Sequence, residues 1–267
     1  MGKTCLFGVL VFSAVAVRAE RIELKTDYAS CVVETRGARI MSFKPADGEE
    51  VVWQADPVQI DDPKWAHGGI PVCWPWFGKP PREGLPKHGL ARYAQWRLEE
   101  KIGKNALRWS LVSTPETMKI WPHAFRLDYT VRASGRKLTL ELKATNTGTA
   151  PFEACGGFHP YFKVGDPQKV ALNGAAITEE TVSVTKPADG KSRELSDLVT
   201  GRRLVLRAKG NEDWYAWNPG RARTPLCVTL GPDEWRQFFC VEPYTATPHV
   251  LKPGESCQMT LTVECRE

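Results

Sequence analysis

The stretch KLTLELKATN, residues 137–146, decides the fold class of this 267-residue chain. Leucine or alanine stands at every second position from Leu138 to Ala144, and threonine, glutamate or lysine fills the positions between. Because successive side chains of a strand point to opposite faces of its sheet, this period of two predicts a strand with one buried and one solvated face.

The same alternation recurs along the chain. It is found in ALRWSLVS (106–113), RRLVLRAKG (202–210) and SCQMTLTVECRE (256–267). The 20 prolines and 22 glycines interrupt the chain too often for a long amphipathic helix. Many short strands separated by turns are typical of an all-β fold, and we expect one large antiparallel β-sandwich domain over residues 20–267.

The first nineteen residues have a different character. Lys3 precedes an apolar run from Cys5 to Val17, and small residues follow at Val17 and Ala19. This pattern is typical of a secretory signal peptide over residues 1–19, cleaved after Ala19, and predicts export to the periplasm or the medium. The alternative is a buried N-terminal strand in a cytoplasmic protein. No other segment is apolar for long enough to cross a bilayer, so we expect no membrane partner.

Charge and cysteine content exclude several classes of partner. Cleavage would remove Lys3 and Arg18 and lower the net charge from +5 to +3, which is too small to predict binding to nucleic acid. The cysteines show no CxxC spacing, so we expect no metal site. Cys257 and Cys265 could form a disulfide with each other, or one of them could pair with Cys31; the spacing leaves this open.

Two aromatic segments interrupt the alternation. HGGIPVCWPWFGKPPREGLPKHGLARYAQW (67–96) combines five prolines with three tryptophans, and FFCVEPYTATPHVLKPGES (238–256) is also rich in proline and aromatic residues. Loops of this composition on a rigid scaffold tend to bind ligands. Tryptophan rings stack on the apolar faces of sugars, so these segments indicate a sugar-binding surface.

Two titratable residues lie within such segments. His159 follows an expected strand in GGFHPYF, and Glu242 interrupts the apolar run of FFCVEPY. Alone, His159 is explained equally by a packed core histidine, and Glu242 by an edge residue that reaches water. A buried glutamate is costly unless it is paired or used, so the two together predict an acid–base pair in a pocket.

Five segments in order give the chain a family resemblance. They are GGIPVCWPWFG (68–78), LPKHGLARYAQW (85–96), residues 121–162 from WPHAF to HPYF, WNPG (217–220) and DEWRQFFCVEPY (233–244). With these segments the chain resembles the aldose 1-epimerase superfamily and, within it, the D-hexose-6-phosphate mutarotases, also called glucose-6-phosphate 1-epimerases. The resemblance implies a galactose mutarotase-like supersandwich, a monomer, and a small-molecule sugar or sugar phosphate as substrate.

The resemblance also implies roles for individual residues. His159 would be the general acid and Glu242 the general base of ring opening, with the histidine protonated and the glutamate ionised at the start, and without cofactor or metal. His88 and Arg92 would contact substrate oxygens, and Arg92 suits a phosphate. His67 stands where phosphate-specific members usually carry arginine. An aspartate that holds sugar hydroxyls would be Asp189, with Asp197 as second choice.

Three other functions remain open at this point. An exported epimerase of free aldoses or uronates would use the same chemistry. A non-catalytic carbohydrate-binding protein would keep the aromatic surface but would not need both His159 and Glu242. A glycoside hydrolase or lyase would need two carboxylates, and the sequence offers one good candidate.

Overall fold

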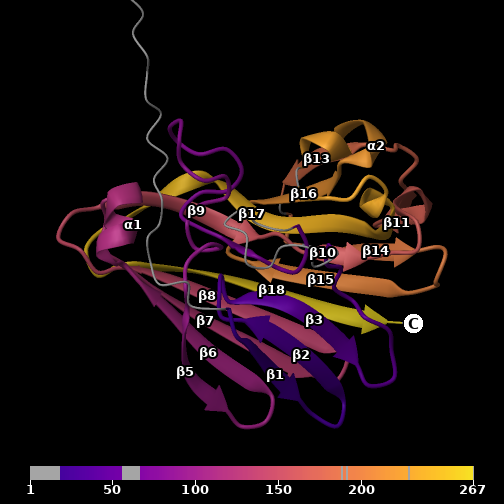
Figure 1. Ribbon diagram of the computed structural model, residues 1–267, viewed down its shortest axis with the longest axis horizontal. Coiled ribbons are helices and arrows are strands. Elements are labelled where there is room, and N and C mark those ends of the chain that lie inside the picture. The colour runs from indigo at the N-terminus through magenta and orange to yellow at the C-terminus, as the bar shows by residue number, and fades with distance from the viewer. Residues whose placement is uncertain (1–18, 56–66, 188, 191, 228, 267) are drawn as a thin grey trace, which may run out of the picture.

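The computed structural model describes residues 19–55, 67–187, 189–190, 192–227 and 229–266 and consists of antiparallel β-sheets that pack in layers (Figure 1). The expected signal peptide lies almost entirely outside the described residues. Two large sheets lie one above the other, and a small third sheet packs against the larger one. The predicted all-β sandwich is confirmed.

The larger sheet has nine strands. In spatial order they are β12 (Ala175–Ala176), β11 (Val170–Leu172), β14 (Arg193–Asp197), β15 (Arg203–Lys209), β18 (Ser256–Arg266), β8 (Lys137–Asn146), β7 (Phe125–Ser134), β6 (Ala106–Val112) and β5 (Arg97–Ile102). The alternation read from β8 is observed, because Leu138, Leu140 and Leu142 are buried and the residues between them are not. Leu140 lies opposite Leu261 of β18, so the apolar positions of neighbouring strands share one face.

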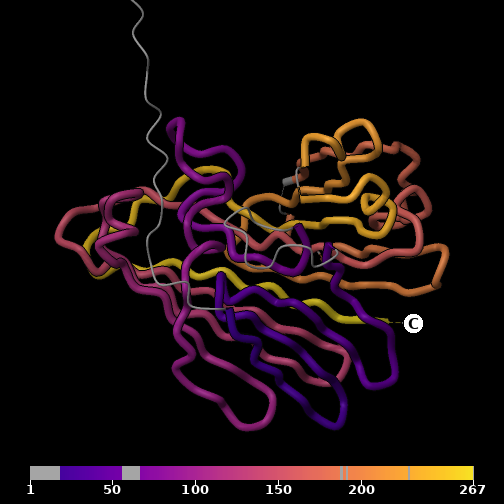
Figure 2. The backbone as a smooth tube through the Cα atoms, viewed as in Figure 1, coloured from indigo at the N-terminus to yellow at the C-terminus, as the bar shows by residue number. Residues whose placement is uncertain are grey.

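The second sheet carries the aromatic segments. Its order is β13 (Val182–Pro187), β16 (Asp213–Asn218), β17 (Phe238–Leu251), β9 (Phe152–Phe158) and β4 (Val72–Cys73), and β10 (Tyr161–Lys163) also pairs with β17. The chain runs from β17 in this sheet directly into β18 in the other, so the two yellow C-terminal strands lie in different layers (Figure 2).

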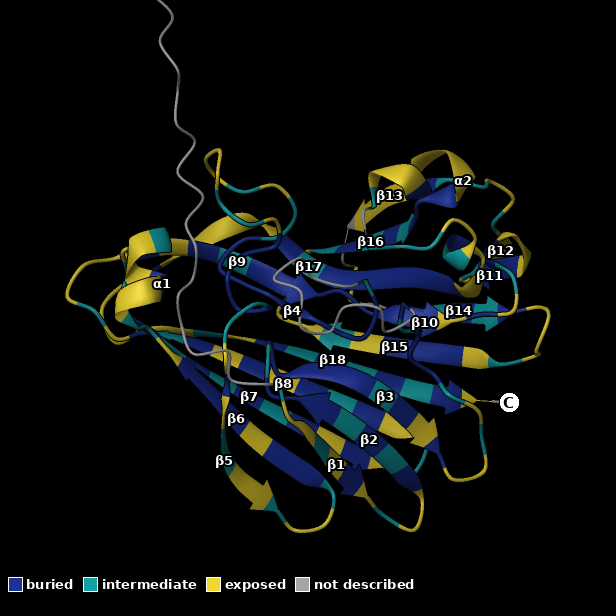
Figure 3. Cartoon of the chain, viewed as in Figure 1, coloured by how far each residue is buried: buried dark blue, intermediate teal, exposed yellow. Residues whose placement is uncertain are grey.

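The third sheet is a meander of β1 (Arg21–Lys25), β2 (Ala29–Glu34) and β3 (Arg39–Pro45), and β2 contacts β7 of the nine-stranded sheet. Dark buried bands alternate with lighter bands along the strands (Figure 3). One apolar cluster joins residues of all three sheets, from Leu24 to Cys265. The sandwich therefore packs around a common core.

Helices are short in the part of the chain that the structure describes. They are α1 (Pro115–Ile120), α2 (Gly220–Arg223) and the 3-10 turns Pro167–Lys169, Thr224–Leu226 and Glu234–Gln237. Thr114 caps α1 and Pro115 occupies its first turn, which explains why a helix begins there. None of the described helices has the length and hydropathy needed to cross a membrane.

The cysteines form no disulfide among the described residues, where Cys31, Cys257 and Cys265 are all thiols. Cys257 and Cys265 belong to the same strand, β18. Eight residues of extended chain separate their Cα atoms by about 27 Å, far beyond the reach of a disulfide. The pairing between these two that the sequence left open is therefore wrong.

Asn218 is expected to stabilise the strand end beside the site. Its side-chain amide is fully buried, donates to the carbonyls of Trp235 and Phe238 at 2.8 Å, and accepts from the Gly220 amide at 2.9 Å. Asn218→Ala should lower the free energy of unfolding by about 2–4 kcal/mol, because buried backbone groups lose their partners.

Urea denaturation measures this change, with Asn105→Ala as the matched control. Asn105 makes an exposed side-chain bond to Arg132, and its loss should cost less than about 0.5 kcal/mol. Equal effects in the two variants would contradict a structural role for Asn218.

Candidate active site

Strand pairing brings His159 and Glu242 together. His159 lies in the link between β9 and β10, and β10 pairs with β17, which carries Glu242. His159 Nδ1 lies 3.5 Å from Glu242 Oε1. The two residues are 6 % and 0 % exposed. Residues 83 positions apart in the sequence thus form one buried pair, as the sequence predicted.

Three side-chain atoms of the pair have no hydrogen-bond partner among the described residues. His159 Nδ1 and both carboxylate oxygens of Glu242 are buried and unbonded. Burial lowers the pKa of His159 well below its ordinary value, and the charges of Arg92 and Lys87 add to this effect. Burial also raises the pKa of Glu242 far above its ordinary value, against the opposing charges of the same two cations.

The directions of these two shifts differ from the expected charge state. The sequence predicted a protonated His159 beside an ionised Glu242. Removing water penalises both charged forms, so a neutral imidazole beside a protonated carboxyl is favoured. The number of protons on the pair is the same in both descriptions, and only the location of the proton differs.

Aromatic rings surround the pair, as the two aromatic segments indicated. The His159 ring is stacked on Tyr161 with centroids 4.7 Å apart. Trp217 lies edge-on to His159 at 5.9 Å, and Phe77 lies 6.2 Å away and is stacked on Tyr244. Tyr215 of β16 lies directly opposite Glu242 in the sheet. The face of the six-stranded sheet around the pair is therefore lined with rings.

His88 is held beside the pair by two loops that bond to each other. Its amide donates to the Gly78 carbonyl, and its Nδ1 accepts from the Gly78 amide at 3.1 Å. The neutral ring therefore carries its proton on Nε2. Its ring centroid is 5.1 Å from that of His159. Gly89 next to it has a φ of +79°, and a Cβ there would meet the Trp74 carbonyl oxygen, so the loop requires glycine.

Two cations lie within electrostatic range of the pair. Arg92 is buried and Lys87 is exposed, and both charges act on His67, His159 and Glu242. The Lys87 carbonyl accepts a long hydrogen bond of 3.5 Å from the Tyr93 hydroxyl. The site is thus positively charged through Arg92 and Lys87.

His67 contributes no charge of its own. Burial and then the charges of Arg92 and Lys87 lower its pKa to about 3. Its Nδ1 lies 2.6 Å from the Thr229 hydroxyl, and its ring lies beside Trp217 with centroids 6.4 Å apart. His67 belongs to the site, where it offers a neutral hydrogen-bonding group.

Asp189, the predicted sugar-binding aspartate, takes part in an ion pair. Asp189 bonds to Arg193 at 3.0 Å, and the Arg193 guanidinium lies over Trp214. Trp214 is three positions from Trp217 on β16 and so faces the opposite side of the sheet, in the core. The contacts of Asp189 do not support the predicted role.

Asp197, the second choice, has a structural role. Its buried carboxylate accepts hydrogen bonds from the backbone amides of Gly165 and Val199 and from the Thr200 hydroxyl. These bonds close the loop that follows β14.

The sequence analysis missed three residues at the site. They are Tyr161, Trp217 and Cys240. A signal for two of them was present, because Tyr161 and Cys240 each lie two positions from a predicted catalytic residue and therefore on the same strand face.

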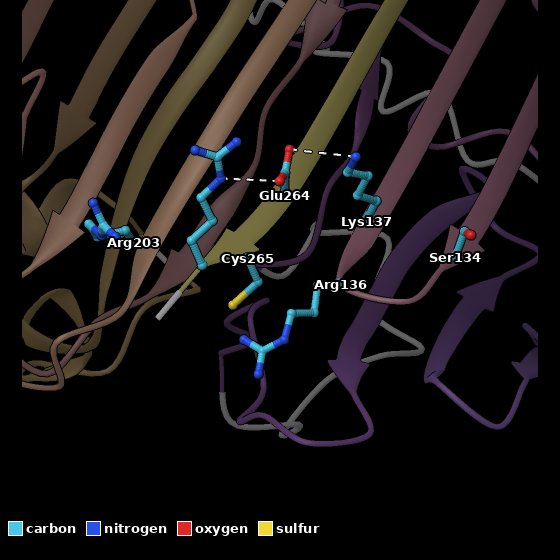
Figure 4. Close-up of a pocket in the computed structure, with 7 residues that line it drawn as sticks. Ser134, Arg136, Lys137, Arg203, Glu264 and Cys265 are labelled. Carbon is cyan, nitrogen blue, oxygen red and sulfur yellow. Dashed lines mark hydrogen bonds and ion pairs between the residues drawn. The ribbon is translucent and has the colours of Figure 1, made fainter.

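A hollow lies at one end of the nine-stranded sheet, away from the pair. It is lined by Ser134, Arg136, Lys137, Arg203, Glu264, Cys265 and Arg266 (Figure 4). Glu264 forms ion pairs there with Arg266 at 3.1 Å and with Lys137 at 3.8 Å. Exposed ion pairs of this kind contribute little to the stability of the fold. The residues that line this hollow include no buried acid–base pair.

Comparison with known proteins decides the family. The model of the family described as aldose 1-epimerase matches residues 20–198, which include His159 and end before Glu242. The chain belongs to the aldose 1-epimerase family. An Escherichia coli protein named "Putative glucose-6-phosphate 1-epimerase" is 30 % identical over 234 residues, which cover 78 % of this chain and 76 % of that protein. A protein of Cenchrus ciliaris with the same name is 29 % identical over 82 % of this chain and 76 % of its own.

Solved structures of aldose 1-epimerase relatives share the fold. A Salmonella typhimurium protein titled "putative mutarotase" superposes with a TM-score of 0.84 at 24 % identity, covering 93 % of this chain and 91 % of that chain. A galactose 1-epimerase from Lactobacillus acidophilus superposes with a TM-score of 0.70 at 14 % identity, covering 93 % of this chain and 95 % of that one. The supersandwich is thus the fold of this chain.

Proposed function

We propose that this protein is a mutarotase that interconverts the α and β anomers of a hexose, with glucose 6-phosphate as its preferred substrate. The buried pair of His159 and Glu242 carries the proposal, because His159 Nδ1 lies 3.5 Å from Glu242 Oε1 and neither atom has a hydrogen-bond partner among the described residues. Anomer exchange needs one group that accepts a proton and one that donates a proton at the same carbon. The anomeric hydroxyl and the ring oxygen share that carbon, so a pair this close reaches both oxygens at once.

The reaction is a pair of coupled proton transfers. Glu242 takes the proton of the anomeric hydroxyl while His159 protonates the ring oxygen, and the ring opens to the aldehyde. Rotation about the adjacent carbon–carbon bond presents the other face of the aldehyde. Closure returns both protons along the reverse route, with the roles of the two residues exchanged.

The neutral form of the pair has a definite place in this cycle. After ring opening, His159 has lost its proton and Glu242 has gained one, which is the form that burial favours in the empty site. A bound sugar supplies hydrogen bonds to the charged imidazolium and carboxylate that burial had removed. Both forms carry one proton, so the sugar selects between them without exchange with solvent.

The phosphate preference is supported by charge. Arg92 and Lys87 place two positive charges near the pair, and the arginine fork suits a phosphate. The names of the E. coli and C. ciliaris relatives agree with this preference. A neutral hexose would leave both cations without an anionic partner on the ligand.

Saturation-transfer NMR on the purified protein tests the proposal. Glucose 6-phosphate, glucose and galactose are compared side by side, with His159→Ala as the blank. Accelerated exchange with preference for the phosphate is expected. Exchange confined to free sugars would overturn the phosphate preference, and binding without exchange would overturn catalysis in favour of a non-catalytic sugar-binding protein.

A second candidate is an epimerase of free aldoses or uronates. The neutral state of His67 favours it, because a site built mainly for phosphate gains from a cation there. A uronate carboxylate would still be attracted by Arg92 and Lys87. Adding glucuronate to the same NMR series separates this candidate from the first.

His67→Arg tests the orientation of the substrate. A permanent charge at this position should raise the ratio of kcat/KM for glucose 6-phosphate over glucose about tenfold, the worth of one charge-assisted hydrogen bond. Steady-state mutarotation assays on both sugars measure the ratio, and the melting temperature checks the fold. An unchanged ratio would show that His67 does not face the phosphate.

Export by the predicted signal peptide is part of the proposal. The mature chain purified from the exported fraction should begin at Glu20, because Val17 and Ala19 offer the small residues that signal peptidase requires. N-terminal sequencing measures this directly. A chain that retains Met1 in the cytoplasmic fraction would contradict export.

A further inference from the structure

Cys240 brings a third ligand atom to the catalytic pair. Within the described part of the chain, His159, Cys240 and Glu242 each offer a nitrogen, sulfur or oxygen atom, and these atoms all lie within 4.8 Å of one another. Cys240 and Glu242 are two positions apart on β17 and share its face, and Tyr161 of β10 lies opposite Cys240. All three side chains are more than nine-tenths buried.

The nitrogen and oxygen ligand atoms have no competing hydrogen-bond partners among the described residues. His159 Nδ1 and both Glu242 oxygens make no hydrogen bond within the described residues. In tetrahedral zinc sites the nitrogen, oxygen and sulfur ligands lie about 3.3–3.6 Å apart, given metal–ligand distances of about 2.0–2.3 Å. The 3.5 Å between His159 and Glu242 already matches such an edge.

We propose that His159, Cys240 and Glu242 bind a thiophilic divalent cation such as Zn²⁺, and that the bound ion blocks the acid–base pair. When the ion displaces the protons of Cys240 and Glu242, the resulting thiolate and carboxylate, together with the imidazole, select Zn²⁺ or Co²⁺ over Mg²⁺ and Ca²⁺, which prefer oxygen ligands alone. The ion occupies the lone pairs through which protons must move. Metal and sugar therefore exclude each other.

Sequence spacing does not reveal this site. Cys240 and Glu242 lie two positions apart on one strand, but His159 comes from the link between two other strands, 81 residues before Cys240, and no CxxC pair is present. The expectation of no metal site rested on that missing spacing. The β10–β17 pairing creates the ligand set.

Cobalt binding to the sugar-free protein is the first test, because it does not depend on mutarotase activity. Co²⁺ added to the chelator-treated protein should give a thiolate-to-cobalt charge-transfer band that Zn²⁺ displaces and Mg²⁺ does not. Cys240→Ser should abolish the band, and Glu242→Gln should weaken cobalt binding roughly tenfold or more. Cys257→Ser, which changes a half-buried thiol on β18, is the matched control and should leave the band intact.

Near-ultraviolet circular dichroism of the metal-free variants confirms that they fold. Each of the two substitutions, Cys240→Ser and Glu242→Gln, nearly preserves the shape of the side chain. The two variants therefore report on the site independently. A missing band in the wild-type protein, or a band of equal strength in Cys240→Ser, would overturn the proposal.

Inhibition of anomer exchange is the second test and rests on the proposed function. Zn²⁺ should inhibit competitively with the sugar, and a chelator should restore exchange. Cobalt binding without inhibition in an active enzyme would overturn the blocking role. A cobalt band in a protein that shows no exchange on any sugar would support the metal site while the proposed function fails.

Discussion

His159→Asn or Glu242→Gln is expected to slow anomer exchange at least about 10³-fold, while substrate binding changes little. Each substitution keeps the size of the side chain but removes its ability to carry the transferred proton, and such groups contribute about 10²–10⁴-fold. Saturation-transfer NMR at a substrate concentration that saturates the enzyme measures the effect as a loss of kcat. The double variant should be no slower than either single variant, because one residue alone cannot complete the coupled transfers.

Two matched variants control for the change of side chain. His123→Asn alters a half-buried histidine near Trp121, and Glu153→Gln alters an exposed glutamate of β9 on another part of the same sheet. Both should keep full activity. A single His159 or Glu242 variant that retains more than about a tenth of wild-type kcat would contradict the acid–base assignment.

Arg92→Ala is expected to lower kcat/KM for glucose 6-phosphate about 10–150-fold more than kcat/KM for free glucose. Hydrogen bonds from a charged group contribute about 1.5–3 kcal/mol. Free glucose has no anionic group that accepts such bonds, so the substitution removes none from it. The ratio of kcat/KM for the two sugars measures the selective part of the loss. Lys87→Met should have a smaller, salt-dependent effect, because this cation is exposed and its charge is screened.

Controls separate recognition from structure. Arg92 is buried, so its loss could also destabilise the loop that carries it. The rate of free-glucose exchange and the melting temperature measure such damage. Arg92→Lys should restore part of the phosphate preference, because it restores the charge without the fork. Arg108→Ala, on the exposed face of β6, should leave kcat/KM for both sugars unchanged. Equal losses on both sugars in Arg92→Ala would contradict phosphate recognition.

The strands were predictable because their signal is local. Leu138, Leu140 and Leu142 alternate with polar residues within one stretch, and burial follows from the pleat of the strand alone. The pairing order was not predictable in this way, because β18 lies between β8 and β15 although more than forty residues separate it from either strand in the sequence. Long-range pairing depends on how the whole core packs.

The candidate site shows the same division. His159 and Glu242 were visible as polar residues inside apolar runs, but Asp189 was proposed from the family resemblance, and the structure describes its bond to Arg193. Loop residues carry no periodic signal, so their contacts follow from the elements that hold the loop.

The all-β class, the family resemblance and the choice of His159 and Glu242 as the candidate pair could be read from local sequence patterns. Only the tertiary structure decided that the pair is 3.5 Å apart, that burial favours its neutral form, and that Cys240 joins it. The physical reason is that strand periodicity is written in neighbouring residues, whereas distance, desolvation and charge depend on groups that folding brings together from distant parts of the chain.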